Sequence, residues 1–170
     1  MVVFDTSFLA LAFDGKAAIP IDPATNLPIA QCKERIDLLI KSLNDSKKRI
    51  LIPTPVLAEY LVRAGEDKNL RLNEFTTSKT FVVAAFDIRA AIECAMIEDG
   101  DSRSGKKTGE PRTKVKFDRQ ILAVAISRKA AVIYTGDIGL ASVARNNKLH
   151  VVMTWEVPLP PMNEQLPLHD

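Results

Sequence analysis

The stretch Val2-Val3-Phe4-Asp5-Thr6-Ser7 decides how the chain begins to fold. Its three apolar residues form a short run of the kind found in a buried parallel strand. An aspartate follows at once, and residues 7–13 then have the composition of a short helix. No basic segment precedes the run and a carboxylate interrupts it, so it is predicted to be a strand and not a signal peptide.

The same alternation of strand and helix continues along the chain. Thr54 is a candidate N-cap and Pro55 suits the first helical position, whereas Gly15, Pro20, Pro23 and Pro28 predict a loop over residues 14–30. Further strands are predicted at residues 50–52, 80–84, 131–134 and 150–153, and helices at 31–47, 54–64, 66–78, 88–98, 117–129 and 138–146. The pattern predicts a three-layer α/β/α sandwich around a central, mostly parallel sheet of four to five strands.

Composition favours one soluble domain. A chain of 170 residues, 46% hydrophobic and 26% charged, suits a single compact core, predicted over residues 1–157 with a proline-rich tail over 158–170. Cys32 and Cys94 lack the spacing of a zinc site or a disulfide framework, which fits a cytoplasmic protein. No apolar run is long enough to cross a bilayer, so no membrane partner is expected.

Four carboxylates are placed where a site would form. Asp5 and Asp137 follow predicted strands, and Glu59 lies in the first turns of the helix after the second strand. Asp118 falls inside an apolar helical stripe that contains Phe117, Ile121, Leu122 and Ala125. Sites in parallel α/β folds lie at the carboxyl ends of the strands, so the four acids are expected around one cleft.

Simpler interpretations stay open for each acid. Asp5, Asp118 and Asp137 could be helix N-caps, and Glu59 could be a solvated surface residue. A carboxylate buried at Asp118, however, needs a partner, and a divalent cation is one such partner.

The local sequences around these acids resemble, in order, the four motifs of PIN-domain ribonucleases. The resemblance is carried by Val2-Val3-Phe4-Asp5-Thr6-Ser7-Phe8-Leu9, Pro53-Thr54-Pro55-Val56-Leu57-Ala58-Glu59, Asp118-Arg119-Gln120-Ile121-Leu122-Ala123-Val124-Ala125 and Tyr134-Thr135-Gly136-Asp137. It covers most of the chain, with apparent insertions near residues 14–30 and 99–116. The segment after Asp137 lacks the second acid that many relatives carry, so Asp137 is the less secure assignment.

The resemblance implies a metal-dependent endoribonuclease that hydrolyses RNA phosphodiester bonds. Asp5, Glu59, Asp118 and Asp137 would be the catalytic and metal-binding residues, with Ser7 and Thr135 in support or, alternatively, in ordinary helix capping. Oxygen donors without histidine or cysteine suit Mg²⁺ or Mn²⁺. Implied partners are RNA, a small antitoxin protein and a second copy of the chain. A toxin of a toxin–antitoxin pair, an RNA-processing enzyme and a catalytically inactive PIN-like scaffold that binds RNA or protein all remain open.

A basic segment leads into Asp118. Between residues 102 and 117 the basic side chains are Arg103, Lys106, Lys107, Arg112, Lys114 and Lys116. We expect a mobile loop, poorly ordered without RNA, that borders the acids and binds RNA phosphates, although a solvated surface loop would look the same. No aromatic residue interrupts the basic run, so base stacking is not indicated there.

Two other classes with a strand followed by an aspartate are disfavoured. A haloacid-dehalogenase-like phosphatase needs a second aspartate at the position of Ser7. A receiver-type signalling domain would need paired acids before its first site residue, and none is present.

Overall fold

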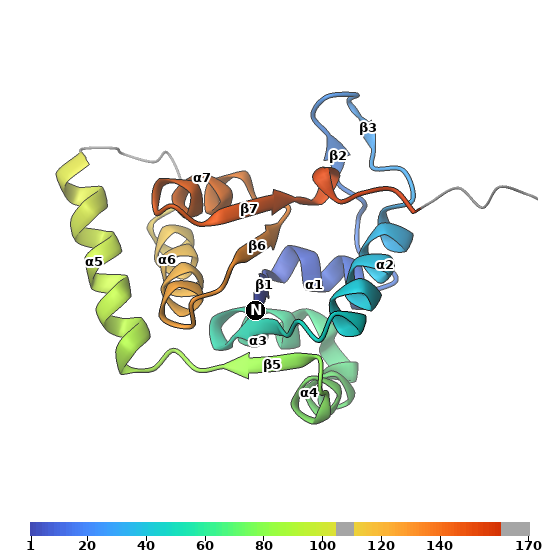
Figure 1. Cartoon of the computed structure of the whole chain (residues 1–170), viewed down its shortest axis with the longest axis horizontal. Coiled ribbons are helices and arrows are strands. Elements are labelled where there is room, and N and C mark those ends of the chain that lie inside the picture. Colours follow the sequence, from blue (N-terminus) through green and yellow to red (C-terminus); the bar gives the residue numbers. More distant parts are fainter. Residues whose placement is uncertain (105–110, 161–170) are drawn as a thin grey trace, which may run out of the picture.

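A parallel sheet forms the centre of the molecule (Figure 1). The computed structural model describes residues 1–104 and 111–160. Within these residues the main sheet has five parallel strands in the order β5-β4-β1-β6-β7. Their bounds are β1 (Val2–Phe4), β4 (Ile50–Pro53), β5 (Phe81–Ala84), β6 (Val132–Thr135) and β7 (His150–Met153). The predicted parallel sheet is thereby confirmed.

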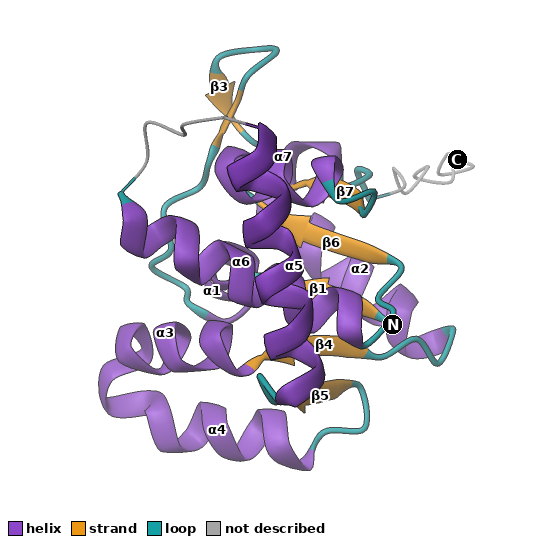
Figure 2. Ribbon diagram, turned by 90° about the vertical axis from the view of Figure 1, so that its left-hand side faces the viewer, coloured by secondary structure: helices purple, strands orange, loops and turns teal. Residues whose placement is uncertain are grey.

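Helices cover both faces of this sheet. They are α1 (Thr6–Phe13), α2 (Cys32–Asp45), α3 (Thr54–Ala64), α4 (Lys68–Thr77), α5 (Ile88–Ser104), α6 (Arg112–Ser127) and α7 (Ile138–Asn146), with 3₁₀ turns η1 (Gly65–Asp67) and η2 (Thr154–Glu156). One buried cluster joins the sheet to helices α1 to α4, and a second joins it mainly to α5, α6 and α7. Figure 2 shows α5 and α6 together on one side of the strands. This is the predicted three-layer sandwich.

The central strand explains why the sequence begins as it does. Successive side chains of a strand point to opposite faces. Val2 and Phe4 accordingly enter the first cluster and Val3 the second. The Phe4 ring packs against Phe8 of α1, with 4.6 Å between ring centroids. Strand β1 is thus fixed on both faces, and Asp5 lies at its carboxyl end.

Residues 14–30 contain more structure than the predicted loop. A small antiparallel pair, β2 (Ile21–Asp22) and β3 (Leu27–Pro28), projects from the domain (Figure 1). The Asp22 side chain accepts a hydrogen bond from the N–H of Ala24, and Asn26 takes a φ of 55°. Asparagine tolerates this left-handed conformation in turns. The Asx turn at Asp22 therefore closes a hairpin within a segment whose prolines had predicted only a loop.

The start of α3 also differs from the prediction. Pro53, not Thr54, takes the cap position of the helix. The Thr54 hydroxyl instead accepts a hydrogen bond from the N–H of Phe86, at 3.0 Å. The Thr54 hydroxyl therefore binds the segment that follows β5 and does not cap its own helix.

The described parts of the basic segment, residues 102–104 and 112–117, are helical, whereas a loop was expected there. Helix α5 continues to Ser104 and α6 begins at Arg112, so Arg103, Arg112, Lys114 and Lys116 all belong to helices. Pro111 occupies the cap position of α6, where its missing N–H is not needed. Lys106 and Lys107 lie outside the described residues, as does most of the predicted tail, from residue 161 onward. The division into a domain over 1–157 and a tail stays a prediction.

No helix in the described part of the chain is long and apolar enough to span a membrane.

Candidate functional site

The four predicted acids line one cavity. It has a volume of about 570 Å³, and Asp5, Glu59, Asp118 and Asp137 all contribute to its walls. Asp5 follows β1, Asp137 follows β6, Glu59 lies on α3 and Asp118 lies on α6. Because β1 and β6 are parallel neighbours, their carboxyl ends bring Asp5 and Asp137 to the same edge of the sheet.

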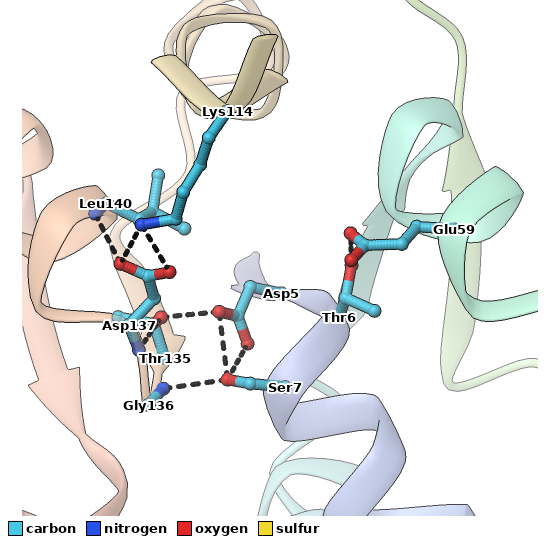
Figure 3. A network of polar contacts seen from close by, with 9 residues as sticks. All are labelled: Asp5, Thr6, Ser7, Glu59, Lys114, Thr135, Gly136, Asp137 and Leu140. Carbon is cyan, nitrogen blue, oxygen red and sulfur yellow. Dashed lines mark hydrogen bonds and ion pairs between the residues drawn. The ribbon is translucent and has the colours of Figure 1, made fainter. Parts of the chain in front are cut away.

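Asp5 is the most constrained of the four. Only 4% of the residue is exposed, and its Oδ1 accepts a hydrogen bond from the N–H of Phe8 at 2.8 Å, which caps α1. Ser7 donates to both carboxylate oxygens at 2.8 and 3.0 Å, and Thr135 donates to Oδ2 at 2.5 Å (Figure 3). The capping interpretation is correct for Asp5, yet capping uses only part of its hydrogen-bonding capacity.

Burial sets the protonation behaviour of Asp5. It raises the pKa of this carboxyl to about 6, against the opposing effect of the hydrogen bonds from Thr135, Phe8 and Ser7. The nearby negative charge of Asp137 raises the pKa further. A bound cation would relieve the same penalty, because it favours the charged form.

Ser7 and Thr135 connect the two strand ends. The Ser7 hydroxyl accepts a hydrogen bond from the N–H of Gly136 at 2.9 Å, and the Thr135 hydroxyl accepts one from the N–H of Asp137 at 2.8 Å. Each hydroxyl also donates to Asp5. Neither residue is a helix cap, because Asp5 and Asp137 occupy those positions. The geometry matches residues that orient a carboxylate.

Asp137 is both a helix cap and one half of an ion pair. Its Oδ1 accepts from the N–H of Leu140 at 3.0 Å, and the Lys114 ammonium lies 3.0 Å from Oδ2 (Figure 3). Burial alone would raise the pKa of Asp137, but the N–H of Leu140 and the Lys114 ammonium hold it below its usual value. Lys114, predicted to bind RNA, therefore also contacts one of the acids.

Glu59 and Asp118 occupy opposite kinds of environment. Glu59 is exposed, and its carboxylate accepts a hydrogen bond from Thr6 at 2.6 Å. Asp118 is only 8% exposed, as its place in the apolar stripe predicted. Because α6 begins at Arg112, Asp118 is not an N-cap. Figure 3 shows Thr6 pointing toward Glu59, whereas the neighbouring Asp5 carboxylate points toward Ser7 and Thr135.

Several cavity residues were missed at the sequence level. Among them are Thr6, Arg63 and Phe117. Gly136, whose N–H donates to Ser7 as described above, was missed as well, although it does not line the cavity. Arg63 lies four residues after Glu59, so helical spacing could have placed both on one face. Phe117 was assigned to the buried stripe, but it is 39% exposed.

The donor set fits a hydrated divalent cation. Within residues 1–104 and 111–160, no group of three or more histidine, cysteine or acidic side chains is gathered closely enough to hold a metal ion by itself. Mg²⁺, however, keeps several waters and takes only one or two carboxylates. The buried Asp5 and Asp118, with Glu59 and Asp137 nearby, supply hard oxygen donors of this kind.

Solved structures of toxin–antitoxin proteins share this fold. A chain of DNA-bound VapBC from Salmonella typhimurium is 21% identical over 90% of this chain and 97% of that chain, with a TM-score of 0.57. A chain of VapBC2 from Rickettsia felis, bound to a DNA fragment from its promoter, is 15% identical over 90% of this chain and 98% of that chain, with a TM-score of 0.60. VapC20 of Mycobacterium tuberculosis, a toxin that cleaves the sarcin-ricin loop, is 16% identical over 84% of this chain and 94% of that chain, with a TM-score of 0.53. The resemblance to PIN-domain ribonucleases is thus confirmed at the level of the fold.

No protein-family model and no curated protein matches the sequence.

Proposed function

We propose that the protein is a metal-dependent endoribonuclease that hydrolyses RNA phosphodiester bonds with Mg²⁺ or Mn²⁺ held by Asp5, Glu59, Asp118 and Asp137. One observation carries the proposal: four acids from four separate elements meet in one cavity at the carboxyl edge of the parallel sheet. Helix capping accounts for Asp5 and Asp137 separately, but gathering like charges in one cavity, with Asp5 and Asp118 buried, is unfavourable unless a cation offsets the repulsion.

The residues divide the work of such a site. A bound divalent cation would supply charge neutralisation at the phosphate and an activated water. Asp5 provides a carboxylate whose orientation is fixed by Ser7 and Thr135. Asp118 provides a second from the wall of α6, and Glu59 and Asp137 would complete the outer contacts through water. Lys114 places a cation beside the acids, where RNA phosphate would enter.

We further propose that the protein is the toxin of a toxin–antitoxin pair, acting on RNA in the cytoplasm. The support is the shared fold with chains of VapBC complexes and with VapC20, a toxin that cleaves the sarcin-ricin loop. A small antitoxin protein and a second copy of the chain would then be its partners. Growth arrest on expression, relieved by a small neighbouring reading frame, distinguishes this role from RNA processing.

A second candidate function is an RNA- or protein-binding scaffold that does not cleave. Two observations favour it. Asp137 is already paired with Lys114, and within residues 1–104 and 111–160 no three histidine, cysteine or acidic side chains lie close enough together to hold a metal ion. The two candidates differ in whether a divalent cation produces cleavage.

The test is an RNA cleavage assay with structured and unstructured RNA in Mg²⁺, Mn²⁺ or EDTA. The wild type is expected to cleave only with the cations, and Asp5→Asn to lose activity by roughly 100-fold or more, since even residues behind a metal ligand contribute 10- to 100-fold. Asparagine keeps the size and the cap, so the variant should stay folded.

The matched control is Asp45→Asn, which changes an exposed aspartate at the end of α2 in the same way. Undiminished cleavage by Asp5→Asn would contradict a metal-binding role for Asp5. A folded wild type that cleaves none of the RNAs with either cation would favour the scaffold.

A further inference from the structure

Phe117 differs from the other phenylalanines of the protein. Among the large apolar side chains that are exposed in the described residues, it is the only aromatic one, at 39%. Phe4, Phe8 and Phe75 are fully buried, and Phe81 is nearly so. A side chain that is exposed to this degree is accessible to a ligand.

Its position is as specific as its exposure. On α6, Lys114, Phe117, Asp118 and Ile121 follow at helical spacing and all line the cavity. The same ridge of the helix therefore carries a cation, an aromatic ring and a buried acid in succession. Phe117 and the four acids line the same cavity, so the Phe117 side chain belongs to the wall of the site.

A second wall faces this ridge. Helix α3 contributes Glu59 and Arg63 to the same cavity, and α3 and α6 are in contact. The cavity thus combines the four acids with two cations, Arg63 and Lys114, and with the Phe117 side chain. Its volume of about 570 Å³ is in the range of sites that enclose a small-molecule-sized group.

We propose that Phe117 stacks on an unpaired base of the bound RNA, next to the phosphate that is cleaved. A base in a duplex hides both its faces against its neighbours, so only an unpaired, unstacked nucleotide can offer one to the ring. Stacking tolerates every base because each has a π-face, whereas Arg63 and Lys114 would contact the phosphates. The proposal rests on the proposed ribonuclease function and gives it a substrate class: loops and single strands.

The experiment is a fluorescence titration in EDTA, so that nothing is cleaved. The probe is a single-stranded oligoribonucleotide that carries 2-aminopurine, whose emission is quenched when the base stacks. Wild type is compared with Phe117→Leu, which keeps apolar bulk without a ring, and Phe117→Trp, which restores a ring. Ile92→Leu is the control, because Ile92 is 58% exposed on α5 and does not line the cavity.

We expect quenching with wild type and Phe117→Trp and little with Phe117→Leu, whose Kd should rise roughly 5- to 150-fold, the equivalent of one base stack. The slope of log Kd against log salt should be unchanged in Phe117→Leu, because no charge is lost, and shallower in Arg63→Gln. The same oligonucleotide in a duplex should bind independently of the ring.

The outcomes separate the stacking proposal from the ribonuclease proposal. If wild type cleaves RNA while Phe117→Leu retains quenching and affinity, stacking is wrong and the ribonuclease stands. Ring-dependent quenching without any cleavage would support stacking and contradict the ribonuclease. A wild type that leaves 2-aminopurine emission unchanged in the single strand overturns stacking, whatever the cleavage assay gives.

Discussion

Gly136 shows how closely the residues around Asp5 are packed. A Cβ at this position would lie 3.1 Å from Thr154 Oγ1 and 3.2 Å from Ser7 Oγ. The Gly136 N–H donates to the same Ser7 hydroxyl that donates to Asp5. Thr154 Oγ1 is buried and has no hydrogen-bond partner among the described residues. Position 136 therefore has no room for a side chain beside Thr154 and Ser7 as they are placed, and only glycine fits there without displacing one of them.

We predict that Gly136→Ala weakens both stability and cleavage. The added methyl must displace Ser7 or Thr154, which should cost about 1–3 kcal/mol, as overpacking does. A displaced Ser7 no longer orients Asp5, so cleavage should fall roughly 10- to 100-fold. Adding Thr154→Ala removes one of the two close atoms and should restore part of both. Urea unfolding and the cleavage rate measure the two effects.

Gly15→Ala is the matched control, because a Cβ there would meet no atom within 4 Å. If Gly136→Ala behaves like Gly15→Ala in both measurements, the close packing at Gly136 has no consequence.

Elements with strong local signals were predicted with their bounds. Helix α7 (Ile138–Asn146) and strand β7 (His150–Met153) agree with the sequence prediction residue for residue. Asp137 caps the one, and a short apolar run marks the other. Such features depend on residues a few positions apart, so sequence alone carries them.

The ends of α5 and α6 depend on distant contacts and were predicted wrongly. A helix was predicted only as far as residue 98, yet α5 passes through Gly100 and continues to Ser104. The two helices pack against each other, and such tertiary packing can override the weak helix propensity of single residues. Helix α6 was predicted to begin at residue 117, whereas it begins at Arg112, directly after Pro111.

The candidate site divides in the same way. The convergence of the acids followed from topology, because parallel strands end at one edge of the sheet. The pairing of Lys114 with Asp137, the contact of Thr6 with Glu59 and the exposure of Phe117 did not follow. Each depends on how α3 and α6 are placed across the cavity, which no local pattern states.

Helix α7 offers a test of whether Asp137 is more than a cap. Asp137→Ala removes the acceptor for the Leu140 N–H and should cost about 0.5–2 kcal/mol in the free energy of unfolding. Asp137→Asn keeps a good cap and should lose little stability. Both variants should cleave more slowly if Asp137 helps to hold the cation, because asparagine lacks the charge.

Asp87 supplies the control for that comparison. It accepts from the N–H of Ala90 at the start of α5 and pairs with Arg128, but it does not line the cavity. Asp87→Asn should therefore leave cleavage unchanged. Full cleavage by Asp137→Asn would mean that Asp137 acts in this protein only as a helix cap.

At the scale of the whole molecule, charge is distributed unevenly rather than in excess. Lysine and arginine number 23 against 21 acids, a net charge of +2. Four of those acids share one cavity, and Asp5 is buried there. Global stability should therefore depend on the protonation of this site far more than the small net charge suggests.

The pH dependence of unfolding measures that link. The folded state raises the pKa of Asp5 from 3.8 to about 6, so it holds the proton more tightly than the unfolded chain. The stabilisation from protonated Asp5 is complete below the unfolded pKa of 3.8 and is lost as the pH rises through about 6. In EDTA, wild type should therefore lose on the order of 3 kcal/mol relative to Asp5→Asn between about pH 4 and about pH 7, at 1.36 kcal/mol per pKa unit. Adding Mn²⁺ near neutral pH should raise the Tm of wild type but not of Asp5→Asn, because a cation bound to the folded state stabilises it. Urea unfolding of both proteins across this pH range measures the difference in their free energies of unfolding. If the two proteins show the same pH dependence, the pKa of Asp5 is not raised in the folded state.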